Sequence, residues 1–118
     1  MRSHGAVASY ALGAEVWQAV VADWKSAPLR PELMATLAFL EKLTLRPEEI
    51  GPADAETALS AGVSREALRD AATVCALFSM IVRLADSLGW DVPEWEAFTQ
   101  RAPAMLEGGY ALQAIEER

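Results

Sequence analysis

Residues 70–89 read DAATVCALFSMIVRLADSLG, and this apolar stretch around the only cysteine, Cys75, decides the fold. Its apolar residues recur at spacings of three and four, which predicts a helix rather than a strand. The helix is expected to run from Arg65 to Leu88, with Ser64 as its N-cap and Gly89 as its left-handed C-terminal residue. We therefore expect an all-α protein with this long apolar helix at its centre.

Prolines and glycines divide the remaining chain into shorter helices. We expect helices over residues 5–12, 14–26, 31–45 and 53–61, and a last helix that opens at residues 93–94 and fades near the sequence EGGY. No repeat, low-complexity tract or linker interrupts this order. The prediction is a single domain over residues 1–118, built from five to six helices.

The composition is that of a globular protein with a generous core. Of the 118 residues, 53% are hydrophobic and 23% are charged, and 17 acids against 10 bases give a net charge of -7. Such a chain repels nucleic acid and anionic membranes, so neither is an expected partner. No apolar window is long enough to span a bilayer without a charge or a helix breaker, and no signal peptide is evident at the N-terminus. With one cysteine and no internal disulfide, we expect a cytoplasmic protein.

The predicted long helix has more apolar surface than one small domain can cover. At 100° per residue its polar side chains fall on one narrow stripe, and the rest of its circumference is apolar. We therefore expect a homo-oligomer. The stripe consists of Arg65, Arg69, Ser79, Arg83, Asp86 and Ser87.

Two residues are candidates for chemistry, Cys75 and His4. One helical turn from Cys75 there are only alanines, Phe78 and Ser79, so no charge on its own helix would activate the thiol. We interpret Cys75 as a core cysteine, with a reactive thiol as the alternative. His4 is the only histidine, and without further ligands at suitable spacing it predicts no metal site. No phosphate-binding glycine loop is present, so no cofactor is expected.

Residues 25–93 contain FLEKLTLRP, ADAETALSAGVSREALRDA and ALFSMIVRLADSLG. In this order they resemble the peroxidase-related branch of the carboxymuconolactone decarboxylase and alkylhydroperoxidase D-like (AhpD-like) superfamily. The resemblance implies an all-helical domain that assembles as a dimer, trimer or hexamer.

The resemblance also implies where peroxidase chemistry would lie. In that family it resides in a Cys-x-x-Cys pair followed by a histidine, which His4 in SHGAVA would match. The second cysteine of the pair would then fall just before Met1, and Cys75 corresponds to no motif cysteine. Ser79 stands where many relatives have Asn. Two explanations remain open, a truncated form of a longer member or a natural short member that lost the redox pair.

Two classes of function follow. The first is an AhpD-like enzyme that reduces peroxides through a thiol, with His4 and Cys75 as its only candidate catalytic residues; because the Cys pair is absent, we expect no competent thiol peroxidase. The second is a non-catalytic helical homo-oligomer that binds a small apolar ligand or a protein partner, in a pocket bordered by Ser79, Arg83 or His4. A simpler interpretation of Arg83 is an ion pair with Asp86. Lactone decarboxylation rests on the superfamily's name alone.

Overall fold

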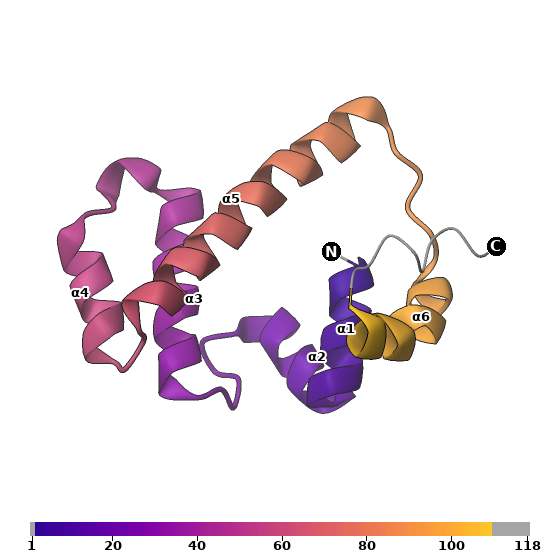
Figure 1. Ribbon diagram of the computed structural model, residues 1–118, viewed down its shortest axis with the longest axis horizontal. Helices are drawn as coiled ribbons and strands as arrows, with labels where there is room; N and C mark the ends of the chain where they lie inside the picture. The colour runs from indigo at the N-terminus through magenta and orange to yellow at the C-terminus, as the bar shows by residue number, and fades with distance from the viewer. Residues whose placement is uncertain (1, 110–118) are drawn as a thin grey trace. The chain divides into compact units, whose positions relative to one another are not determined.

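The computed structural model describes residues 2–109, and in this range the chain is helical without any strand (Figure 1). The all-α prediction, with five to six helices and one long apolar helix, is confirmed. The elements are α1 (Arg2–Leu12), α2 (Ala14–Asp23), α3 (Pro31–Leu45), the 3₁₀ turn η1 (Pro47–Glu49), α4 (Pro52–Ser60), α5 (Arg65–Leu88) and α6 (Trp95–Gly108).

Contacts group the chain into two compact units. Among residues 2–109, one unit combines residues 2–28 and 91–109, and the other consists of residues 29–90. The N- and C-terminal helices thus share a unit, and the central unit holds α3, η1, α4 and α5. The prediction of a single domain stays a prediction.

Local signals fix the ends of the central helices where the sequence predicts them. Pro31 is the first residue of α3, where its missing N–H costs no helical hydrogen bond. The Ser64 hydroxyl accepts a hydrogen bond of 3.0 Å from the Ala67 amide and so caps α5. Gly89, at φ 62° and ψ 40°, ends the same helix in the left-handed region that glycine enters without strain.

The core of the central unit is small. Its buried side chains are Ala58 of α4, Val63 of the following turn and Leu68 of α5. The half-buried Phe39 of α3 packs against them, together with Ala35 and Ala55. Because Leu68 lies in the first turns of α5, only the beginning of this 24-residue helix contributes a buried side chain to that core.

An ion pair joins α3 to α4 beside this core. Lys42 Nζ donates to Asp54 Oδ1 at 2.7 Å, and the Gly51 amide donates to Asp54 Oδ2 at 2.9 Å. About a quarter of each charged side chain remains exposed. The hydrogen bond from Lys42 and then the one from Gly51 lower the pKa of Asp54 below its ordinary value of 3.8.

The unit of residues 2–28 and 91–109 has small buried side chains. Ala6 of α1 and Ala102 of α6 are buried, and α1 packs against both α2 and α6. A side chain at Gly5 would place its Cβ 2.5 Å from Trp17 Cζ2, so this close approach of α1 and α2 requires glycine.

Several predicted boundaries need correction by a few residues. The first helix starts at Arg2 rather than at residue 5, and the second ends at Asp23 rather than at residue 26. The fourth α-helix begins one residue early, at Pro52, and α6 begins at Trp95 rather than at residues 93–94. The turn at Pro47–Glu49 was not predicted, because a single 3₁₀ turn leaves no periodic signal in a proline-rich loop.

We expect Asp54→Asn to destabilise the folded chain at about pH 7 and to have progressively less effect as the pH falls below about 4. Since the folded-state pKa of Asp54 lies below its unfolded value, the carboxylate stabilises the folded chain above about pH 4, and this stabilisation is lost as the pH falls through the lowered pKa. Thermal unfolding of both proteins across this range measures the difference. Asp70→Asn, which removes an exposed partner of Arg69, serves as the control and should change the pH profile little. A constant gap between Asp54→Asn and the parent at every pH would contradict the assignment.

Candidate functional site

The two halves of α5 differ in which side of the helix is apolar. In the first half, the buried Leu68 and the half-buried Ala71, Ala72 and Cys75 lie on one side. Glu66 and Asp70, at about 160° from Leu68 at 100° per residue, are exposed on the other. This half is therefore an ordinary amphipathic helix packed on α3 and α4.

From Val74 onward the apolar side is the opposite one. Ser79, Arg83 and Asp86 now continue the side that Leu68 occupies, and large apolar residues cover the side where Glu66 and Asp70 lie. Figure 1 shows this half of α5 extending beyond α3 and α4 within the central unit. The result is an exposed surface, here called the α5 apolar surface, made of Val74, Leu77, Phe78, Met80, Ile81, Leu84 and Leu88. Val82 is also exposed, but it lies about 40° from Leu68 and so on the other side of the helix.

Exposed apolar side chains are concentrated on this surface among the described residues. Its seven side chains are 38–63% exposed, and they make up seven of the seventeen exposed large apolar residues among those described. All seven lie within 15 successive residues, a length of about 21 Å along the helix axis. Contiguous apolar patches of this kind mark interaction surfaces more often than isolated exposed leucines do.

Cys75 lies at the edge of the packed side of α5. It is half-buried, and its Sγ is 3.3 Å from Thr44 Oγ1 near the end of α3. The sequence interpretation of a core cysteine did not include this polar neighbour, because Thr44 is 31 residues away along the chain. A hydroxyl is neither a strong base nor a cation, so this contact does not supply the activation that a nucleophilic thiol needs.

Ser79 and Arg83 occupy the next two turns on the same side of α5. The Arg83 side chain donates through Nη1 to the carbonyl oxygen of Ser79 at 2.8 Å. The predicted ion pair with Asp86 is not among the contacts of the described residues. Side chains on a helix lean toward its N-terminus, which directs the long guanidinium of Arg83 back to the preceding turn rather than forward.

His4 belongs to the other unit, on α1, where it is exposed. Partial desolvation is the main factor that lowers the pKa of His4 below 6.5, so the imidazole is neutral at neutral pH. Among residues 2–109, no three His, Cys, Asp or Glu side chains come together as metal ligands.

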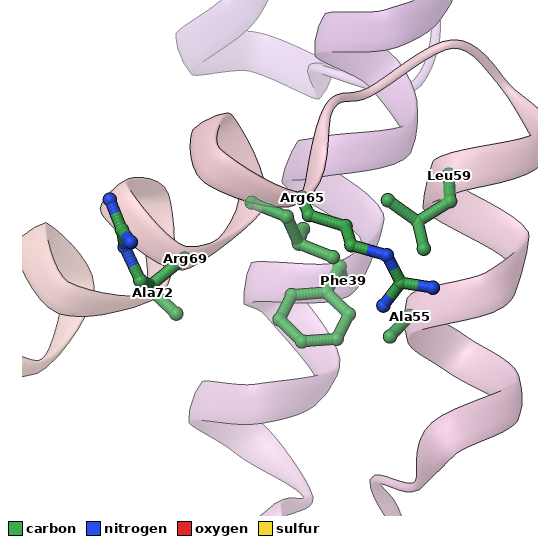
Figure 2. Close-up of a pocket in the computed structure, with 7 residues that line it drawn as sticks. Phe39, Ala55, Leu59, Arg65, Arg69 and Ala72 are labelled. Atoms are coloured by element: carbon green, nitrogen blue, oxygen red, sulfur yellow. The ribbon is translucent and has the colours of Figure 1, made fainter.

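A hollow of about 230 Å³ lies where α3, α4 and the start of α5 meet, and Figure 2 shows its lining. The Phe39 ring forms its floor, and the Arg65 side chain extends over it toward Ala55 and Leu59 (Figure 2). The hollow is open and smaller than the roughly 300–1,000 Å³ of typical ligand pockets. None of Ser79, Arg83 and His4 lines it. The predicted pocket residues are therefore not part of this hollow.

α5 is also long and apolar enough to cross a membrane when judged by length and composition alone. The sequence analysis excluded a membrane span because charges interrupt the apolar stretch. The helix is nevertheless apolar enough to span a bilayer with Arg83 and Asp86 included. A span would carry both charges into the hydrocarbon region, at a cost of about 2.5–3.5 kcal/mol each on insertion scales. A single helix of this kind is weak support for a membrane span, and α5 differs from the core helices that share the feature in that none of its apolar window is buried.

Comparison of the chain with protein-family models, with curated proteins and with solved structures finds no match. The AhpD-like resemblance of residues 25–93 therefore stays a prediction. The functional feature that sequence reasoning located only in part is the α5 apolar surface. The sequence showed that these residues are apolar, but not which side of α5 would be left exposed. The change of the polar side of the helix at Val74 was the signal that could have identified the exposed side.

We expect Thr44→Ala to make the Cys75 sulfur more accessible and to speed its reaction with an aromatic disulfide reagent by a few-fold, because the threonine hydroxyl contacts the sulfur in the folded protein. The rate is followed by absorbance on folded protein. Thr36→Ala is the matched control, since the Thr36 hydroxyl on the same helix donates to the Glu32 carbonyl instead. Equal rates for the parent and Thr44→Ala would show that Thr44 does not shield the thiol.

Proposed function

We propose that this chain is a non-catalytic helical scaffold of AhpD-like type, acting in the cytoplasm as a homo-oligomer that assembles through the α5 apolar surface. The single observation that carries the proposal is the exposure of seven large apolar side chains on one side of one half of one helix. The central unit leaves this surface uncovered, whereas a partner of similar character would remove it from water.

The size of the α5 apolar surface suits a modest protein interface. At about 25 cal/mol per Å², burying the exposed half of each side chain contributes on the order of 1 kcal/mol and removes about 50 Å². Seven side chains on each of two copies therefore give roughly 700 Å². This is below the roughly 1,200–2,000 Å² of stable specific interfaces and in the range of weak, transient ones, so we expect association no tighter than the micromolar range.

The surroundings of Cys75 support the non-catalytic part of the proposal. A thiol peroxidase needs a thiolate and a second thiol to resolve the sulfenic acid. The contact described for Cys75 is a threonine hydroxyl, and the chain holds no second cysteine. Peroxide would therefore meet a thiol of ordinary reactivity.

We expect the parent and Cys75→Ser to consume hydrogen peroxide at the same background rate when dithiothreitol is the reductant. The single thiol lacks the activating neighbour and the resolving partner that turnover requires. Loss of peroxide is followed directly, with a reaction without protein as the blank. A Cys75-dependent rate well above that blank would favour the peroxidase hypothesis instead.

We expect the folded chain to be an oligomer at about 50 µM and to dissociate on dilution below about 1 µM, because the interface is modest in area. Size-exclusion chromatography with light scattering measures the mass at each concentration. A chain that stays monomeric at the higher concentration, with native circular dichroism, would refute assembly through the α5 apolar surface.

A further inference from the structure

The α5 apolar surface contains a regular seam. Five of its residues follow one another at steps of three, four, three and four, which is the spacing of a and d positions in a heptad. All five are 43–63% exposed. In heptad order they are Val74 (a), Leu77 (d), Ile81 (a), Leu84 (d) and Leu88 (a), here called the α5 seam.

The residue types of the α5 seam favour two strands. Its first two a positions are the β-branched Val74 and Ile81, and both d positions are leucine. This combination packs best in two-stranded coiled coils, whereas isoleucine at both a and d, or leucine at a with isoleucine at d, shifts the preference toward more strands. The seam therefore predicts one partner helix.

The positions beside the seam carry no charge. The e and g positions from residue 73 to residue 87 hold Thr, Phe, Met, Ala and Ser. Within residues 73–88 the only charged residues, Arg83 and Asp86, fall at c and f, on the outer side of a two-stranded pair. Asp70, one turn before Val74, falls at the preceding d position and ends the apolar seam. Between residues 73 and 88, two copies that each carry a net charge of -7 can therefore approach without bringing like charges into contact.

The side of α5 that faces away from the seam already packs on α3 and α4. Leu68 and Cys75 both fall at b positions of the same heptad frame, and they lie on the side that packs on α3 and α4. A partner on the seam would thus leave the central unit intact, with α5 placed between α3 and α4 on one side and the partner on the other. Lipid could also cover the α5 seam, but lipid does not require apolar residues at heptad spacing. A helix in lipid would in addition carry the charges of Arg83 and Asp86 into the hydrocarbon region.

We infer that the partner is α5 of a second copy of this chain, paired along the α5 seam in a two-stranded coiled coil, so that the protein is a dimer. This inference rests on the proposed function and adds the stoichiometry and the contact residues. It also places Cys75, Ser79 and Arg83 outside the dimer contact, at b, f and c positions.

The test compares Leu77→Glu and Leu84→Glu with Val82→Glu in the full chain. Each of the first two puts an unpaired charge into the seam, and we expect the dissociation constant of the dimer to rise by roughly a hundred-fold or more. Val82 is the matched control, because it is an exposed valine on the same half of α5 but lies at b; its variant should change the constant by less than about five-fold. Sedimentation equilibrium measures the masses, and circular dichroism with thermal unfolding checks that every variant is folded.

If a glutamate variant does not fold, Leu84→Ala replaces it, with an expected rise of about ten-fold or more. A parent of dimeric mass that dissociates only in the seam variants supports the inference. A trimer or hexamer, or a dimer that survives both seam variants, overturns the inference and leaves the proposed oligomer standing. A monomeric parent chain overturns both the dimer and the proposed oligomer. A parent chain that binds phosphatidylcholine vesicles through the α5 seam, and is monomeric without vesicles, overturns both as well.

Discussion

The change of polar side along α5 is the constraint on which the rest of this protein depends. Before Val74, the helix is apolar toward α3 and α4 and polar toward the outside, as Leu68 and Glu66 illustrate. After Val74 the arrangement is reversed. A helix of this kind can bury its apolar side chains only when two different surfaces cover it, one for each half. The central unit provides the first of these surfaces.

This constraint also bears on the chemistry of the only thiol. Cys75 lies at the point where the packed half of α5 ends, and its neighbour across the helices is a threonine. Ser79 and Arg83 follow Cys75 on the same side of α5. The Arg83 guanidinium donates a hydrogen bond to the Ser79 carbonyl oxygen of the same helix. The Arg83 side chain is thereby used within α5 itself. The arrangement resembles the margin of a packed core more than the centre of a reaction site.

The sequence predicted the helices well wherever local chemistry sets their ends. Ser64 and Gly89 bound α5, and Pro31 begins α3, because caps, left-handed glycines and first-turn prolines act within a few residues. It predicted tertiary contacts poorly. The neighbour of Cys75, the pairing of Lys42 with Asp54 and the contact of Gly5 with Trp17 depend on how helices cross, which periodicity does not encode. For Arg83, sequence spacing suggested Asp86, but the direction in which helical side chains lean decided otherwise.

The small size of the core links folding to association. The buried side chains of the described residues are four alanines, one valine and one leucine, and none of the large side chains is fully enclosed. Such a core removes little apolar area from water, and small domains are only marginally stable to begin with. A partner that binds only the folded chain adds its binding free energy to the stability of the fold. In the proposed assembly, the half of α5 that the central unit leaves uncovered is where the chain would gain the stability that its core does not provide, and folding and assembly would then be one equilibrium that depends on concentration.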